Sequence, residues 1–307
     1  MEIRSGNTVF LGAGFSKWCC DLPLVSQLFD FDVRADNRRE SNKISRLEKI
    51  YARWIEKSNS NNAELFIESM QDDDSNSKLV NWYITRRLTE PFVKRYSRRF
   101  TWYINSYHAS TDPGIRLAYE FLRHSTSLPN SAVITTNYDM IVEYALSSRG
   151  FNYGIPNERI GYSPYPYPKP VYVSGTLPLL KLHGSLSWSE RAKFPDLRCG
   201  LNGECVIVPP RARKTPREHF PTQWEMAERV LRRTRKTVFF GFAFNEYDVD
   251  VWELLSKNLV DSDSILLMDV VDHRPRIAER FNVKSIDFID VRNGFRPSEI
   301  FKYLFGA

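Results

Sequence analysis

The stretch NTVFLGAGFSKW, residues 7–18, decides the fold class of this 307-residue chain. The apolar run Val9, Phe10 and Leu11 is typical of a buried strand, and two glycines follow it with the spacing of the dinucleotide-binding fingerprint. Lys17 stands where the third glycine of that fingerprint belongs. We therefore predict a strand, a tight glycine turn and a helix, with a loop that departs from the dehydrogenase pattern.

Strand-to-helix patterns recur along the chain. Short apolar runs lie in SAVITTNY (131–138), LPLLKLHGS (177–185), TVFFGFAF (237–244) and SILLMDV (264–270). Their alternation with helical spacing favours an α/β fold, a Rossmann-like parallel sheet flanked by helices. Helical periodicity and a single glycine predict a mainly helical insertion at 36–130. The sheet domain is then expected to comprise residues 1–35 and 131–307.

Two helices and one loop are predicted with specific boundaries. Leu24 and Leu28 are expected on the face of the first helix. A later helix is expected to begin with Thr222 as N-cap and Glu225 in the capping-box position, and to run to about Lys236. The tract GYSPYPYPKPVY, residues 161–172, is predicted to be a loop because its prolines exclude helix and most ladder positions.

The net charge of +6 has a local origin. Between Arg211 and Lys236, nine Lys and Arg residues stand against three Glu residues, and this excess equals the net charge of the whole chain. Such a segment is either a solvated helix face or a surface for nucleic acid, and both interpretations stay open.

Composition places the chain among globular proteins, with 42% hydrophobic residues. It has neither a run of about 20 apolar residues for a membrane helix nor a secretory leader pattern. Its four cysteines are too few and too irregularly spaced for a disulfide framework, so we expect a cytoplasmic protein without membrane association. The cysteines are Cys19, Cys20, Cys199 and Cys205.

Four of the predicted strands lead directly into short polar or glycine-rich motifs. In a parallel sheet the carboxyl ends of the strands share one edge, so motifs that are distant in sequence converge on one crevice. Each motif by itself is explained by a tight turn, a helix cap or a histidine at a strand end. Their recurrence favours one shared site. The motifs are GAGFS (12–16), TTNYD (135–139), HGS (183–185) and GFAFN (241–245).

In this order, GAGFS, TTNYD, LHGS and GFAFNEYD resemble the motifs of the sirtuin fold family. The resemblance covers residues of about 7–35 and 130–272, and is nearest to the divergent sirtuin-like (Sir2-type) NAD-hydrolysing domains of prokaryotic antiphage defence systems. It implies an NAD glycohydrolase that cleaves its substrate NAD to ADP-ribose and nicotinamide. It further implies a regulated defence effector that depletes NAD.

The resemblance and the chemistry of the side chains assign roles. His183, a base near neutral pH, and Asn137, a neutral donor and acceptor, are the expected catalytic residues. The glycine loop is expected to bind the diphosphate at a helix N-terminus. The resemblance implies that Asp139 orients the nicotinamide or its ribose. Asp269 at a strand end is expected on the adenosine side. The full expected binding set is Gly12, Ala13, Gly14, Ser16, Asp139, Gly241, Asn245 and Asp269.

Departures from the family pattern bear on the reaction. Deacylases of this family carry C-x-x-C pairs for structural zinc, and this sequence has none, so no metal is expected. Asp21-Leu22-Pro23-Leu24 has the family's proline without the aromatic–arginine pair. A protein deacylase or ADP-ribosyltransferase stays an alternative, as does a non-catalytic module that senses NAD or ADP-ribose within a larger complex. Asp32 is spaced like a dehydrogenase ribose acid, but no convincing second strand precedes it.

Regulation is expected because an uncontrolled NADase would exhaust its own cell. The sequence shows no obvious sensor segment. The resemblance therefore implies control by homo-oligomer formation or by a separate activating partner, such as a HerA-type ATPase or an Argonaute-type protein.

Overall fold

The computed structural model of the chain describes eight segments. They are residues 6–96, 112–146, 150–153, 176–188, 198–212, 215–259, 264–294 and 296–305. The Tyr/Pro tract predicted to be a loop, residues 161–172, lies outside these segments, as do Arg213 and Lys214 of the basic segment.

Seven parallel strands form one sheet in the order β3-β4-β2-β1-β5-β6-β7. This confirms the predicted Rossmann-like α/β fold. The chain builds outward from β1 in two directions, so the boundary between β1 and β5 is the topological switch point of the sheet. The strands are β1 (Gly6–Leu11), β2 (Ala132–Thr135), β3 (Phe151–Asn152), β4 (Leu177–Lys181), β5 (Thr234–Phe240), β6 (Ser264–Asp269) and β7 (Ser285–Asp290).

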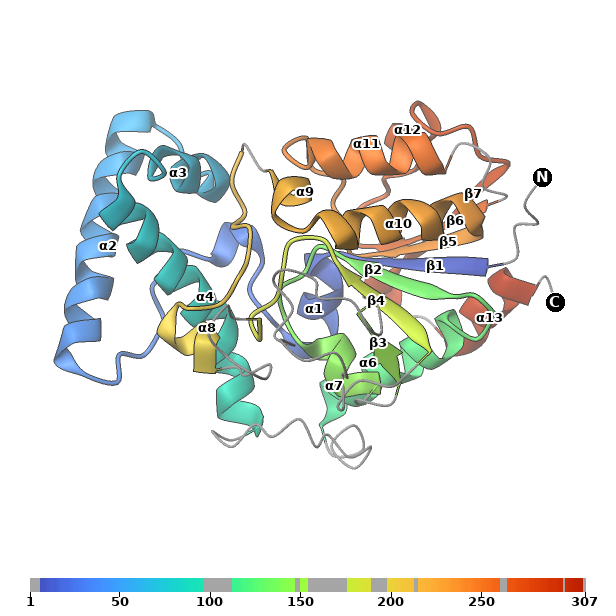
Figure 1. The fold of residues 1–307 in the computed structure, drawn as a ribbon, viewed down its shortest axis with the longest axis horizontal. Helices are drawn as coiled ribbons and strands as arrows, with labels where there is room; N and C mark the ends of the chain where they lie inside the picture. Colours follow the sequence, from blue (N-terminus) through green and yellow to red (C-terminus); the bar gives the residue numbers. More distant parts are fainter. Residues whose placement is uncertain are drawn as a thin grey trace.

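Helices cover both faces of the sheet (Figure 1). One layer contains α1 (Ala13–Cys20), α6 (Pro113–Ser125), α7 (Ile141–Leu146) and α13 (Pro297–Phe305). The other contains α9 (Pro216–His219), α10 (Pro221–Arg233), α11 (Val249–Asn258) and α12 (Arg274–Ala278). The central strands β1 and β2 are buried on both faces, which is why they read as continuous apolar runs rather than alternating ones.

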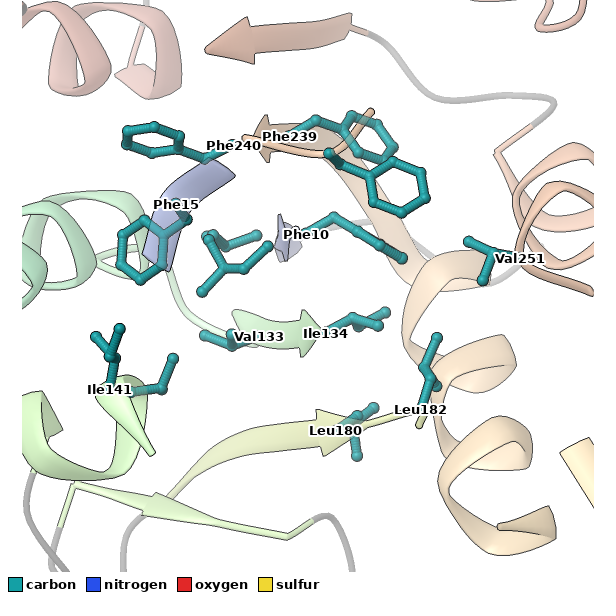
Figure 2. Close-up of a cluster of buried hydrophobic side chains, with 14 of the residues drawn as sticks. Phe10, Phe15, Val133, Ile134, Ile141, Leu180, Leu182, Phe239, Phe240 and Val251 are labelled. Carbon is teal, nitrogen blue, oxygen red and sulfur yellow. The ribbon is translucent and has the colours of Figure 1, made fainter. Parts of the chain in front are cut away.

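The core forms where the central strands direct aromatic and branched side chains to the two faces in turn (Figure 2). Phe10 of β1 and Phe239 of β5 lie on one face with ring centroids 5.3 Å apart. Phe240 points to the opposite face, where its ring meets that of Phe15 of α1 at 5.2 Å. This packing fixes α1, and with it the glycine loop, against the switch point.

Three helices between the first strand–helix unit and β2 gather at one side of the sheet (Figure 1). They are α2 (Arg38–Ser58), α3 (Ala63–Ser69) and α4 (Asp74–Tyr96), with α8 (Arg198–Asn202) packed beside α4. Phe29, which follows α1, anchors this group through ring contacts with Phe66 and Tyr83, at 4.9 and 5.8 Å. The helical character predicted for this region is therefore present.

Helix α6, although it falls within the predicted 36–130 insertion, packs with the sheet layer. It contacts α1, α7 and α13, and its Phe121 ring lies 5.0 Å from that of Phe240 in β5. By its packing, α6 thus lies with the helices that cover the sheet, and it leads into β2.

Three predicted helix boundaries are wrong. Helix α1 ends at Cys20, because Asp21 adopts a left-handed conformation with φ of 54°. Leu24 and Leu28 therefore lie outside the helix, where they flank the 3-10 turn Val25–Gln27. Helix α10 begins at Pro221 with Phe220 as N-cap instead of Thr222, since proline suits the first helical position. It ends at Arg233, because the residues from Thr234 onward pair in the sheet as β5.

Several cations of the basic segment 211–236 make internal contacts. The Lys236 Nζ donates hydrogen bonds to the carbonyls of Tyr303 and Leu304, at the end of α13. Arg217 and Arg232 both pair with Glu228. These contacts favour the structural interpretation for these three cations. Within the described segments, no helix is long and apolar enough to cross a membrane.

Candidate functional site

Two glycine loops meet backbone to backbone at the switch point. The Gly12 amide donates to the Phe240 carbonyl at 3.0 Å, and the Gly14 amide donates to the Gly241 carbonyl at 2.9 Å. Gly241 has φ of +61°, and a Cβ there would lie 2.2 Å from the Phe15 nitrogen. Gly241 thus permits the close helix-to-strand packing that the third glycine supplies in the dinucleotide fingerprint.

A cavity of about 610 Å³ opens above these loops, at the carboxyl edge of the sheet. Its volume lies within the roughly 300–1,000 Å³ typical of small-molecule sites. Residues at or just after the carboxyl ends of β1, β2, β4, β5 and β6 form part of its wall. The segment after α1 adds an apolar side, formed by Leu22, Pro23, Leu24, Val25 and Leu28. The insertion also reaches it, through Glu64 of α3 and Leu88 of α4.

The structure brings the predicted site residues together. Both expected catalytic residues and seven of the eight expected binding residues line this one cavity. Gly12 is the exception, since it lies in the loop contact beside Gly241 and accepts a hydrogen bond from Asn137. The residues that line the cavity are Ala13, Gly14, Ser16, Asn137, Asp139, His183, Gly241, Asn245 and Asp269.

Asn137, Ser16 and Asp139 form a hydrogen-bonded chain across the cavity wall. The Asn137 Nδ2 donates to the Ser16 Oγ at 2.8 Å, and the Ser16 hydroxyl donates to the Asp139 Oδ2 at 2.6 Å. The Asp139 Oδ1 accepts from the Ile141 amide at the start of α7. A carboxylate at a helix N-terminus is favourably placed for its charge. The chain joins the glycine loop to the TTNYD loop.

The orientation of the Asn137 amide follows from its partners. The Gly12 carbonyl, 2.8 Å from Nδ2, can only accept a hydrogen bond, so the nitrogen of the amide must face it. Nδ2 also donates to the Ser16 Oγ, so both hydrogens of the Asn137 amide group are used. The Asn137 Oδ1 is therefore the atom of this side chain that can accept a hydrogen bond from a ligand.

His183 reaches the cavity through a tight turn after β4. It is 4% exposed, and its ring lies beside that of Tyr138, with centroids 6.3 Å apart. The next residue, Gly184, has φ of +86°, and a Cβ there would lie 2.3 Å from the Val206 carbonyl oxygen. The His-Gly pair is thus explained locally, because only glycine fits the turn that directs His183 toward the cavity.

On the far side of the cavity, Asn245 and Asp269 are held by protein contacts. The Asn245 Nδ2 donates to the Glu64 Oε2 at 2.7 Å, and its Oδ1 accepts from the Tyr247 amide. The Asp269 Oδ1 accepts from the amide of Val270 at 2.6 Å. Burial raises the pKa of the Asp269 carboxyl, although hydrogen bonds from the backbone partly oppose this shift. Asn245 therefore links the insertion to the sheet domain.

The sequence interpretation missed several residues of the cavity. Glu64 lies in a helix of the insertion, and no local pattern distinguishes it from a surface acid. Tyr138 and Asp248 lie within motifs that were identified, but only their neighbours were selected. Burial raises the pKa of the Tyr138 hydroxyl, and the charges of Asp248 and Glu64 add to the shift. In the described part of the chain, no group of three or more His, Cys, Asp or Glu residues is arranged to hold a metal ion.

Residues 131–279 match the family model described as the SIR2-like domain. This part of the chain is therefore similar to SIR2-like domains, and it contains the TTNYD, HGS and GFAFN motifs. Such a similarity implies a protein that uses NAD. The match includes Asn137, His183 and Gly241.

Comparison with solved structures finds two Sir2 structures at 13% identity. One comes from work on the structural basis for the mechanism and regulation of Sir2 enzymes, with a TM-score of 0.44 over 99% of this chain and 94% of that chain. The other is a substituted Sir2 homologue in complex with 2'-O-acetyl ADP ribose, with a TM-score of 0.45 over 97% and 91%. No curated protein matches the sequence.

Proposed function

We propose that this protein is an NAD glycohydrolase that converts NAD and water to ADP-ribose, nicotinamide and a proton. The observation that carries the proposal is the convergence of Asn137, Asp139 and His183 with the glycine loop on one cavity at the switch point. Dinucleotides bind at this position in doubly wound sheets. The SIR2-like match over 131–279 supports NAD as the ligand.

The proposed catalytic residues act on the nicotinamide ribose. Cleavage of a glycosidic bond passes through an oxocarbenium-like state, which is helped by acceptors near the ribose hydroxyls and the attacking water. The Asn137 Oδ1 is such an acceptor, and hydrogen bonds to Gly12 and Ser16 hold it in place. His183 accepts a proton from a ribose hydroxyl or from water. Asp139, anchored by Ser16, orients the nicotinamide ribose.

The remaining proposed contacts hold the rest of the dinucleotide. The amide of Ala13 is the first of helix α1 and has no carbonyl one turn before it in the helix, so it can donate to the diphosphate. The Gly14 amide is hydrogen-bonded to the Gly241 carbonyl, so it is not counted as a donor to the diphosphate. Gly14 instead allows the ligand to approach the backbone closely, because it has no side chain. Asp269 lines the same cavity, and in this proposal its carboxylate accepts hydrogen bonds from the adenosine ribose. In this proposal Gly241 and Asn245 form the part of the cavity wall between the diphosphate and the adenosine ribose. Asn245 is held there by its hydrogen bond to Glu64.

The proposed biological role is that of a cytoplasmic antiphage effector which depletes NAD when released from inhibition. It rests on the motif resemblance given above. Homo-oligomer formation, or a separate activator such as a HerA-type ATPase or an Argonaute-type protein, would supply the control. Nucleic acid contact through the basic segment 211–236 is the weaker part of this proposal, because Lys236, Arg217 and Arg232 make internal contacts.

A product assay tests the proposal. Purified protein, with and without candidate activators, is incubated with NAD, and nicotinamide and ADP-ribose are quantified with and without an acyl-lysine peptide. We expect equal amounts of both products without peptide, and a loss of about 10²-fold or more in Asn137→Ala. Asn76→Ala, on the surface of the insertion, is the matched control with unchanged turnover.

Three results would contradict the hydrolase. Nicotinamide release that requires the peptide would identify a deacylase or a transferase. NAD binding without turnover under every condition would identify a sensing module. Unchanged turnover in Asn137→Ala would place the chemistry elsewhere.

A further inference from the structure

A buried ion pair lies directly behind the TTNYD loop. Lys181, the last residue of β4, and Glu143 of α7 each expose 1% of their side chains, and the Nζ and Oε1 atoms are 2.9 Å apart. Burial raises the pKa of Glu143, and the charge of Lys181 opposes that shift. The desolvation of two buried charges largely offsets their attraction, so stability alone does not explain this pair.

The ammonium group of Lys181 also holds the backbone of the loop. Its Nζ donates to the carbonyl of Tyr138 at 3.4 Å and to the carbonyl of Asp139. An ammonium has three hydrogens, and Glu143 with these two carbonyls provides three acceptors. With the carbonyls of Tyr138 and Asp139 bound behind the loop, the side chains of Asn137 and Asp139 lie in the cavity wall.

The Tyr138 carbonyl joins the TTNYD loop to the turn after β4. The Tyr138 carbonyl also accepts from the Leu186 amide at 2.9 Å and from the Ser185 Oγ at 3.4 Å. Both donors belong to the turn that carries His183, which follows Lys181 by two residues. Lys181 is thus bonded to the loop of Asn137 and lies in the strand that presents His183.

We propose that Lys181 is a positioning residue that sets the geometry between Asn137, Asp139 and His183, a role that rests on the proposed NAD hydrolysis. The contact with Glu143 keeps the lysine side chain directed at the two carbonyls. Without the ammonium group the Tyr138 carbonyl keeps the Leu186 amide, whereas the Asp139 carbonyl must find another partner, and the loop turns to reach it. A displacement of about 1 Å in catalytic groups is enough to cost about 10²-fold in rate.

The test separates charge, donors and packing. The double variant Lys181→Met/Glu143→Leu removes both charges together, so no unpaired buried charge remains. Glu143→Gln keeps the lysine and an acceptor for it. The matched control is Arg86→Met, which removes a cation that is also buried and bonded to a carbonyl, that of Arg34, but which lies in the insertion.

Four quantities are measured for each variant: the urea midpoint, the kcat for nicotinamide release, the KM for NAD, and the hydrogen-exchange rate of the amides at 136–140. We expect the double variant to lose at least about tenfold in kcat and to exchange at least about tenfold faster, with a midpoint near wild type. Glu143→Gln keeps kcat within about threefold, and Arg86→Met leaves kcat and exchange at 136–140 unchanged.

The proposal is overturned if the double variant keeps kcat within about threefold and exchanges like wild type. It is also overturned if Arg86→Met lowers kcat as much. Should the double variant fail to fold, the pair Lys181→Leu/Glu143→Met, which also leaves neither charge nor donor, is measured instead, with the same outcomes decisive. If wild type releases no nicotinamide, the proposed function fails, while the exchange rates at 136–140 still decide whether Lys181 positions the loop.

Discussion

At the scale of single residues, Gly241 replaces the missing third glycine of the N-terminal motif. Its left-handed φ and its contact with the Phe15 nitrogen both exclude a side chain. We expect Gly241→Ala to lower the free energy of unfolding by about 2–4 kcal/mol, since an alanine there is strained and must also displace backbone. Urea unfolding measures this loss.

Gly294 offers the matched control, because its φ is +71° and a Cβ there would meet nothing within 4 Å. We expect Gly294→Ala to cost only the conformational strain, about 1–2 kcal/mol. Equal losses in the two variants would show that the close approach at Gly241 contributes nothing.

Asp269 gives a prediction for pH dependence. Because burial raises its pKa above 3.8, the folded protein binds a proton there more tightly than the unfolded chain does. The stability that this group contributes is therefore present below pH 3.8 and is lost as the pH rises through the raised pKa. In Asp269→Asn this loss is absent.

We accordingly expect the urea midpoint of Asp269→Asn, relative to wild type, to be higher at pH 7 than at about pH 4. Asn retains an oxygen that can accept from Val270, so the local turn is kept. A relative midpoint that falls between pH 4 and pH 7 would contradict the direction of the pKa shift.

At the scale of elements, Lys236 binds the end of α13 to β5. Its ammonium donates to the Tyr303 and Leu304 carbonyls, which are among the last carbonyls of that helix. We expect Lys236→Met to lower the free energy of unfolding by about 1–3 kcal/mol, the range for hydrogen bonds to charged groups. The exposed Arg229 of α10 is the control, with Arg229→Met within about 0.5 kcal/mol of wild type. Equal midpoints for the two variants would contradict this cap.

The elements differ in how well the sequence predicts them. Central strands such as β1 and β5 are predicted because burial on both faces demands apolar runs. The edge strand β7 was missed, since its SIDFID pattern is half polar, and β3 has only two residues. The end of α1 was misplaced because Asp21 ends the helix in a left-handed conformation, with its amide bonded to the Lys17 carbonyl, and aspartate is a weaker signal of such an end than glycine.

At the scale of the whole molecule, one cavity joins the sheet domain to the insertion. The topology rule for parallel sheets predicts that the four strand-end motifs meet, and nine of the ten predicted residues line the cavity. The rule says nothing of an inserted segment, so Glu64 and its bond to Asn245 were not predictable. Nor does it predict partners behind a loop, such as Lys181 and Glu143.

The central claim is that NAD both binds and is cleaved in this cavity, with His183 as the base. The most direct test measures nicotinamide release and NAD affinity on the same preparations of wild type and His183→Ala, each with its activator if one is required. His124→Ala, a histidine on the surface of α6, is the control. We predict that His183→Ala keeps its NAD affinity within a few-fold and loses about 10²-fold or more in turnover. Turnover in His183→Ala equal to that of wild type would contradict the account.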